Sequence, residues 1–156
     1  MSEPAWKAAN RAHWDEKVAL HLGPRGYNLA SLRAGQGRFN AIEEAELWPV
    51  AGSRILHLQC HFGSDSLKLA QRGATVVGLD FSAPAIDAAR RLASELGLAD
   101  RARFFVGDWA AAMASRFGRF SMQPSGSLAC LRLCARTMGR PLPGRGRAGC
   151  RAWGFG

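Results

Sequence analysis

The chain has 156 residues, 47% of them hydrophobic and 9% aromatic, which is enough for one hydrophobic core and too short for two full-sized domains. It contains no apolar run of the roughly 18 residues that a membrane span needs, and residues 1–20 are too polar for a signal peptide. These properties exclude an integral membrane protein and predict a single domain in the cytoplasm.

The formal net charge of +9 suggests a nucleic-acid partner, but the charge is distributed unevenly along the chain. All 12 acidic residues lie up to Asp108, together with 13 of the 21 Lys and Arg residues. The last 48 residues carry 8 Arg and no acid. This segment has few aromatic residues and no recognisable groove-binding module, so nucleic acid is the less favoured partner.

The four cysteines do not indicate a disulfide framework, because no secretory signal accompanies them. No C-x-x-C pair is present, and Cys60 with His61 lacks a third ligand at a recognisable spacing. We therefore predict no metal site. A packed Cys60 and a His61 in contact with solvent are the favoured interpretation.

The first part of the chain, residues 1–50, is predicted to form a helical cap segment. Residues 4–20 combine strong helix formers with recurring apolar positions and predict a helix. A loop rich in Gly and Arg follows over residues 22–40. Asn40 then stands at the N-cap of a short helix that Pro49 ends.

From Arg54 onward, short apolar segments alternate with amphipathic ones. The expected strands are residues 55–58, 74–79 and 101–108, and the expected helices are residues 64–72 and 83–97. This β-α-β-α-β order predicts an α/β fold with a parallel sheet and right-handed crossovers. Residues 51–120 would thus be the first half of a doubly wound domain.

The C-terminal segment, residues 121–156, is predicted to be an irregular basic tail. It is dominated by Gly, Arg, Pro, Ser and Cys, a composition typical of disorder. The abrupt loss of every acid and every Lys favours a frameshifted or otherwise aberrant terminus. A sheet of three parallel strands would then leave the strand at residues 55–58, or its neighbour, with an unpaired apolar edge and the domain marginally stable.

The turn after the first strand, "QCHFG", predicts which nucleotide the domain can hold. A pyrophosphate must approach the helix N-terminus closely, and the G-x-G-x-x-G fingerprint provides residues without side chains there. Here the corresponding places hold Gln59, His61 and Ser64. NAD, NADP and FAD are therefore disfavoured, whereas a cofactor without phosphates is compatible with this turn.

Two acids follow the next two strands and extend this interpretation. Asp80 ends the second strand, where a carboxylate can accept hydrogen bonds from ribose hydroxyls. Asp108 ends the third, where a carboxylate can accept from an exocyclic amine such as that of adenine. The simpler alternatives are that Asp80 caps the next helix with Ser82 and that Asp108 belongs to an ordinary turn.

The segments "LHLQCHFGSDSL" and "GLDFSAPAIDAAR" resemble a glycine-poor bacterial branch of the class I S-adenosylmethionine-dependent methyltransferases. The resemblance covers residues 10–120 and includes "NRAHWDEKVALHL", which in relatives precedes the Rossmann-like fold and lies over the cofactor. It implies that S-adenosyl-L-methionine contacts Gln59, Cys60 and Gly63 with its methionine moiety, Asp80 with its ribose, and Phe81, Asp108 and Trp109 with its adenine.

The resemblance implies methyl transfer to a small-molecule acceptor, with activity impaired if the fold is truncated after about residue 120. His57 stands where many members of the superfamily carry an acid. No general base and no oligomeric state follow from the sequence. Two alternatives stay open: a nucleic-acid-binding protein acting through the arginine-rich tail, and a dinucleotide-dependent oxidoreductase.

Overall fold

The structure is a computed structural model that describes residues 4–47, 49–108, 120–125 and 128–133. Its helices are α1 (Ala5–Leu22), α2 (Leu29–Arg33), α3 (Ala41–Leu47), α4 (Ser64–Gln71) and α5 (Ala83–Glu95). Its strands are β1 (Arg54–Leu58), β2 (Thr75–Asp80), β3 (Ala102–Val106), β4 (Phe120–Ser125) and β5 (Leu128–Leu133). In the described ranges, no helix is both long and apolar enough to cross a membrane. A cytoplasmic location stays a prediction.

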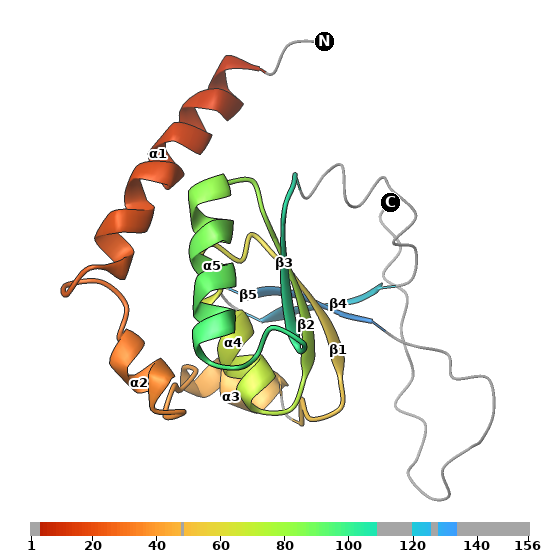
Figure 1. The fold of residues 1–156 in the computed structure, drawn as a ribbon. Helices are drawn as coiled ribbons and strands as arrows, with labels where there is room; N and C mark the ends of the chain where they lie inside the picture. Colours follow the sequence, from red (N-terminus) through yellow and green to blue (C-terminus); the bar gives the residue numbers. More distant parts are fainter. Residues whose placement is uncertain (1–3, 48, 109–119, 126–127, 134–156) are drawn as a thin grey trace, which may run out of the picture.

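The predicted β-α-β-α-β order is confirmed, and it forms the parallel part of one sheet (Figure 1). β1 pairs in parallel with β2, with Leu58 opposite Leu79, and β2 pairs in parallel with β3, with Asp80 opposite Val106. The carboxyl ends of the three strands therefore meet at one edge. That edge carries the turn after β1 and both acids that the sequence singled out.

The prediction of an irregular segment from residue 121 is wrong for β4 and β5, which form an antiparallel pair. β5 also pairs antiparallel with β1, so the sheet order is β3-β2-β1-β5-β4 and β1 is an interior strand. Of the two strands for which an unpaired edge was expected, β1 is therefore paired on both sides. β4 contains Pro124, which has no backbone N–H to donate. Because β4 is an edge strand of the sheet, this missing donor is tolerated. Residues 134–156 lie outside the described residues.

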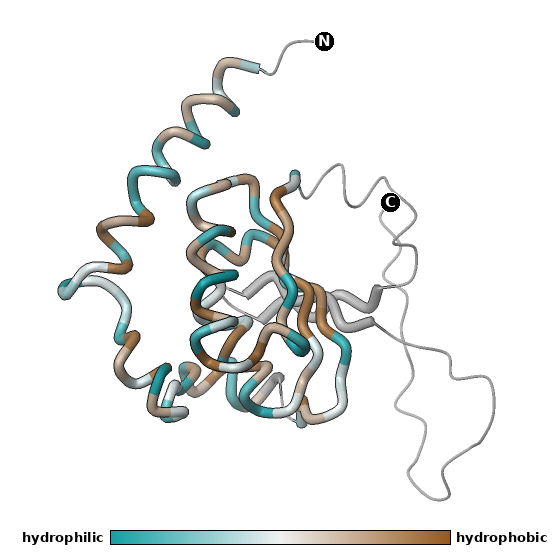
Figure 2. The backbone as a smooth tube through the Cα atoms, in the orientation of Figure 1, coloured by the Kyte–Doolittle hydropathy of each residue, from teal (hydrophilic) through white to brown (hydrophobic). Residues whose placement is uncertain are grey.

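Helices α4 and α5 cover one face of the parallel strands and bury the main core (Figure 1). Alternate strand residues, such as Ile55, Val76 and Phe104, point into this core and are almost fully buried. Leu56 and Leu58 form a smaller cluster with Val77 and Leu79 on the opposite face. Figure 2 shows the hydrophobic stretches concentrated in these strands. The buried strands explain why the sequence reads there as short apolar runs.

The N-terminal helices pack around this unit through side-chain contacts from several directions. α1 is confirmed as an N-terminal helix, and it contacts α5. The capping prediction for α3 is also confirmed, since the Asn40 side chain accepts from the backbone N–H of Glu43. α2 was not predicted. It lies inside the expected loop, where Asn28 caps five residues by accepting from the N–H of Ser31.

Candidate functional site

The turn after β1 has a strained backbone that hydrogen bonds hold in place. Gln59 and His61 both have positive φ, 55° and 52°, a region that residues other than Gly seldom adopt. The N–H of Cys60 donates to Leu79 across the sheet at 3.1 Å, and the N–H of Gly63 donates to the Cys60 carbonyl at 2.9 Å. Sparsely populated backbone conformations of this kind concentrate at ligand sites and active sites. The turn is therefore a built feature of the sheet edge.

Gly63 is the only glycine of the turn, and two independent constraints require it. Its φ is +76°, and a Cβ there would lie 2.6 Å from the ring of Phe104 on β3. A Cβ on Gly78 of β2 would meet the same ring at 2.5 Å. The aromatic ring thus fills the space that both glycines leave open beneath the turn. Gly63 consequently serves close packing against the sheet as well as the turn itself.

Asp80 connects the turn after β1 with the end of β2. One carboxylate oxygen accepts from the backbone N–H of His61 at 2.7 Å, and the other accepts from the N–H of Ser82 at 2.9 Å. The residue is only 6% exposed. The capping part of the alternative is confirmed for Ser82, whose hydroxyl accepts from the N–H of Ala85, whereas Asp80 accepts from the N–H of Ser82 and not from a residue of α5. The structure thus shows Asp80 ordering the turn.

The remaining predicted site residues differ in how exposed they are at this edge. Gln59 is exposed, Phe81 is half-buried, and Asp108 is partly exposed two residues beyond β3. Cys60 is 5% exposed and packs in the core, as the alternative for this residue predicted. Burial raises the pKa of its thiol well above the ordinary value, so the sulfur is not an activated nucleophile. Trp109 lies outside the described residues.

Helix α1 runs along the same edge and contacts the chain after each of the three strands. Lys7 forms an ion pair with Asp108 after β3. Asp15 accepts a hydrogen bond of 2.5 Å from the hydroxyl of Ser82, which follows β2. His21 lies 2.9 Å from His61, nitrogen to nitrogen, in the turn after β1. These contacts make α1 a cover over the predicted cofactor edge, and sequence spacing could not reveal them because the partners lie 40 residues or more apart.

An aromatic cluster anchors α1 on the turn. Trp14 and His21 of α1 contact the ring of His61 edge-on, with centroids 5.7 Å and 5.1 Å away. Tyr27 contacts both His21 and Phe62 at 5.4 Å and 5.0 Å. Burial lowers the pKa of His61, with the nearby His21 acting in the same direction. As a neutral imidazole, His61 can therefore share one hydrogen bond with the His21 ring at neutral pH.

His57 on β1 is a core residue. It is 4% exposed, and its Nδ1 lies 2.7 Å from the hydroxyl of Ser66 on α4. Burial lowers the pKa of the imidazole to about 4, against the opposing effect of Asp65. The side chain thus joins β1 to α4 as a neutral partner, beneath the cofactor edge.

The fold should lose stability in acid because of His57. A pKa lowered from 6.5 to about 4 means that between these values the unfolded chain binds a proton that the folded chain does not. The contribution of His57 to the free energy of unfolding is nearly constant above pH 6.5. Between pH 6.5 and pH 4 it falls by about 1.4 kcal/mol per pH unit, which gives a loss of about 2 kcal/mol between pH 7 and pH 5. Urea unfolding at the two pH values measures this difference. His57→Gln, which does not titrate, should flatten the profile; an equally steep profile in the variant would assign the loss to other groups.

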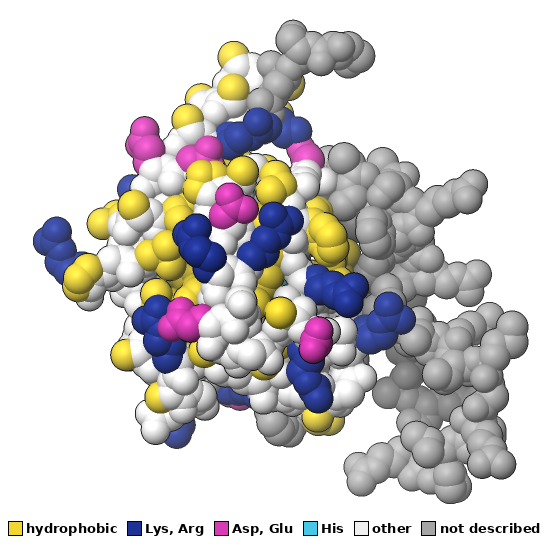
Figure 3. Space-filling view, in the orientation of Figure 1, with side chains coloured by type: hydrophobic (Ala, Val, Ile, Leu, Met, Phe, Trp, Pro, Cys, Tyr) yellow, Lys and Arg dark blue, Asp and Glu magenta, His cyan; other side chains and the backbone are white. Residues whose placement is uncertain are grey.

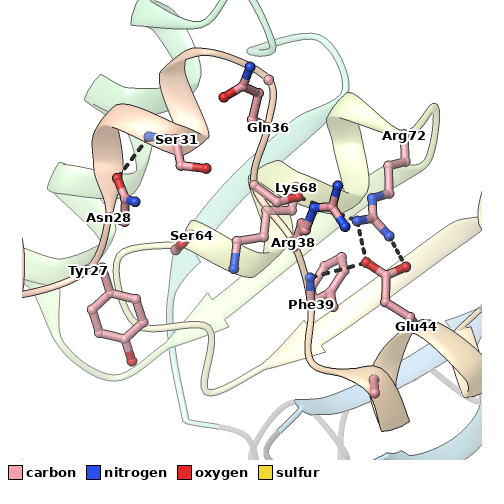
Figure 4. A pocket seen from close by; sticks show the side chains of 13 residues that line it. Tyr27, Asn28, Ser31, Gln36, Arg38, Phe39, Glu44, Ser64, Lys68 and Arg72 are labelled. Carbon is pink, nitrogen blue, oxygen red and sulfur yellow. Dashed lines mark hydrogen bonds and ion pairs between the residues drawn. The ribbon is translucent and has the colours of Figure 1, made fainter.

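A second feature, a groove of about 1260 Å³, lies between the segment at residues 27–44 and helix α4 (Figure 4). Ser64 and Lys68 of α4 and its C-cap residue Arg72 line it at intervals of four residues, on one side of the helix. Arg38 and Phe39 line the facing wall. The sequence reasoning missed this groove. The spacing of four residues along α4 could have indicated a polar face on this helix. The facing wall could not be predicted, because it comes from the segment at residues 22–40, which was expected to be a loop.

Comparison with known families identifies the part of the chain that holds the sheet edge. A family model described as "Methyltransferase domain" matches residues 55–130. The release factor glutamine methyltransferase of Rhodospirillum rubrum is 34% identical over 119 residues, covering 70% of this chain and 37% of that protein. The 23S rRNA (uracil(1939)-C(5))-methyltransferase RlmD of Acidithiobacillus ferrooxidans is 36% identical over 94 residues, covering 60% of this chain and 21% of that protein.

The chain thus spans little more than a third of the first relative and about a fifth of the second. Among solved structures, a SAM-dependent methyltransferase from Thiobacillus denitrificans in complex with S-adenosyl-L-homocysteine is 26% identical, with a TM-score of 0.38 over 54% of this chain and 38% of that one. The structure of WbdD is 26% identical, with a TM-score of 0.39 over 74% of this chain and 22% of that one. Residues 55–130 therefore belong to the methyltransferase domain family.

Proposed function

We propose that the chain binds S-adenosyl-L-methionine at the carboxyl ends of β1, β2 and β3 and transfers the methyl group to a small-molecule acceptor. The observation that carries the proposal is the bond from the His61 N–H to Asp80, which joins the turn after β1 to the acid after β2. In doubly wound folds, nucleoside ligands bind in the crevice beyond the strand ends. The match to a methyltransferase family that uses S-adenosyl-L-methionine supports this proposal.

The carboxylate of Asp80 fits the ribose of such a cofactor. An ionised carboxylate offers about four lone-pair positions, and two of them are used by the N–H groups of His61 and Ser82. The others suffice for two ribose hydroxyls. Phe81, half-buried directly after Asp80, supplies an aromatic face for the adenine. Gln59 and the backbone of Gly63 would then lie toward the methionine moiety.

Cofactor binding in this arrangement involves α1. The carboxylate of Asp108, proposed to accept from the adenine amine, is paired with Lys7, and the Ser82 hydroxyl is paired with Asp15. The Asp108 carboxylate can accept from the adenine amine and from the Lys7 ammonium together, since it offers about four lone-pair positions. The His21–His61 contact holds the other end of α1 in place. α1 would therefore stay over the bound adenosyl group.

The bound cofactor would supply an electrophilic methyl group on a sulfonium centre. The residues of this chain would orient the adenosyl group and exclude water from it, through Asp80, Phe81 and the cover formed by α1. Placement of this kind accounts for a large share of the barrier reduction when two reactants are brought together. None of the described residues at the edge is assigned as a general base.

Binding measurements test the proposal directly. Calorimetry with S-adenosyl-L-homocysteine and, separately, with NAD should give binding of the first and none of the second, because the turn after β1 lacks the early glycines that a pyrophosphate needs. NAD binding without S-adenosyl-L-homocysteine binding would overturn the proposal in favour of an oxidoreductase. A reduced heat signal with S-adenosyl-L-homocysteine in Asp80→Asn would place that ligand at this edge.

The nucleic-acid alternative rests on the arginine-rich tail, most of which lies outside the described residues. Figure 3 shows Lys and Arg side chains separated by acidic and apolar ones over the described part of this face, without a continuous basic patch. Two of the relatives are named as rRNA methyltransferases, so RNA stays open as an acceptor class. The small-molecule acceptor is the proposal that the groove beside α4 favours.

A further inference from the structure

The groove beside α4 carries more positive than negative charge. Arg38, Lys68 and Arg72 line it, and Glu44 is the acid in its wall. The ring of Phe39 lies beneath two of the cations, 5.2 Å from the Lys68 ammonium and 4.7 Å from the Arg72 guanidinium. An aromatic face of this kind favours cations and fixes their position. The groove is thus a cationic surface built on a rigid base.

The three cations differ in how far they are already neutralised. Arg72 donates two hydrogen bonds of 2.6 Å to Glu44, and Lys68 pairs with Asp65 at 2.8 Å. The bonds from Arg72 hold the pKa of the Glu44 carboxyl below its ordinary value, and the charge of Arg38 acts in the same direction. Among the described residues, Arg38 forms no ion pair. Its guanidinium is therefore the group with most capacity for a ligand.

We propose that this groove binds an anionic group, a phosphate or a carboxylate, of the small molecule that accepts the methyl group. Arg38 would bind the anion in a fork-like geometry, Lys68 would add charge, and Arg72 would fix Glu44 and thereby the wall. Neutral donors on the same walls, Asn28, Ser31 and Gln36, suit further polar groups. This identification of the acceptor rests on the proposed methyl transfer.

The position and size of the groove support a small molecule. Ser64 lies at the groove and directly follows Gly63, so one end of the groove reaches the turn at the proposed cofactor edge. A volume of about 1260 Å³ far exceeds one phosphate and accommodates a drug-sized molecule. A nucleic acid, by contrast, is commonly held through about 6–10 phosphate contacts, which three largely paired cations do not provide.

The test is a ¹H–¹⁵N NMR titration of the full chain with phenyl phosphate and, in a parallel arm, benzoate. We expect shifts at Arg38, Phe39 and Lys68, and a dissociation constant at least about fivefold higher in Arg38→Gln, since a hydrogen bond to a charged group is worth roughly 1.5–3 kcal/mol when well shielded. Arg91→Gln makes the same change at an exposed position of α5. It is the matched control and should leave binding unchanged. The two arms distinguish phosphate from carboxylate as the source of the charge.

Three outcomes would overturn the inference: equal affinity in Arg38→Gln and the unaltered chain, shifts confined to residues outside the groove, or tighter Arg38-dependent binding of a single-stranded RNA oligonucleotide than of phenyl phosphate. Titration of the unaltered chain with S-adenosyl-L-homocysteine separates this inference from the proposed function. Arg38-dependent anion binding without cofactor binding would support the anion site but would reject the identification of the bound anion as part of a methyl acceptor. Cofactor binding without Arg38-dependent anion binding would reject only the groove.

Discussion

Replacing Asp80 by alanine is expected to lower the affinity for S-adenosyl-L-homocysteine at least about 100-fold and to destabilise the fold by about 2–5 kcal/mol. The affinity loss follows from two charge-assisted hydrogen bonds to ribose hydroxyls, each worth roughly 1.5–3 kcal/mol. The stability loss follows from the N–H groups of His61 and Ser82, which lose their acceptor in a site where Asp80 is 6% exposed. Calorimetry measures the first effect and urea unfolding the second.

Two further variants separate binding from folding at this position. Asp80→Asn keeps the shape and one carbonyl acceptor, so it should retain more stability than Asp80→Ala and still lose affinity, because the charge is gone. Asp87→Asn makes the same change at an exposed residue of α5, whose pairing with Arg90 spans 3.5 Å. It should change neither quantity measurably. Unchanged cofactor affinity in Asp80→Asn would remove Asp80 from the ribose site.

The second large effect is expected for Gly63→Ala, which should destabilise the chain by about 2–5 kcal/mol. The left-handed backbone costs a residue with a Cβ roughly 1–2 kcal/mol. Overpacking in a core costs typically about 1–3 kcal/mol more, and here the added Cβ would lie 2.6 Å from the Phe104 ring. Urea unfolding at pH 7 measures the sum.

Gly97→Ala isolates the backbone contribution. Gly97 has nearly the same φ, +66°, but a Cβ there would have nothing within 4 Å. It should therefore cost only about 1–2 kcal/mol, and the excess in Gly63→Ala would measure the clash with Phe104. Pairing Gly63→Ala with Phe104→Leu should recover part of that excess. Equal losses in the two glycine variants would show that the turn tolerates the clash by moving away from the sheet.

The elements that the sequence predicted well are those with strong local signals. The apolar runs, the caps at Asn40 and Ser82, and the glycines that close the helices all act within a few residues of chain. The same signals placed the turn after β1, Asp80 and Asp108 at one edge, since parallel strands align their carboxyl ends. The cofactor roles of all seven residues stay predictions: Gln59, Cys60, Gly63, Asp80, Phe81, Asp108 and Trp109.

Where the prediction was wrong, long-range pairing decided the outcome. The apolar and polar residues of β4 alternate over only four residues before Pro124, and those of β5 do not alternate regularly. They form because β1 presents a free row of backbone donors and acceptors, and pairing with β5 satisfies it. Helix α2 likewise depends on one cap and on contacts with α4 rather than on propensity.

By itself, the sequence determined the α/β order, because short-range steric and hydrogen-bonding rules govern it. The same rules predicted the edge where a nucleoside would bind and the exclusion of a pyrophosphate cofactor. Only the tertiary structure brought α1 across that edge, with Lys7, Asp15 and His21 each meeting a partner far along the chain. It likewise assembled the cationic groove from Arg38 and α4. Contacts between distant segments depend on how whole helices and strands pack against one another. The spacing of residues within one segment does not determine that packing.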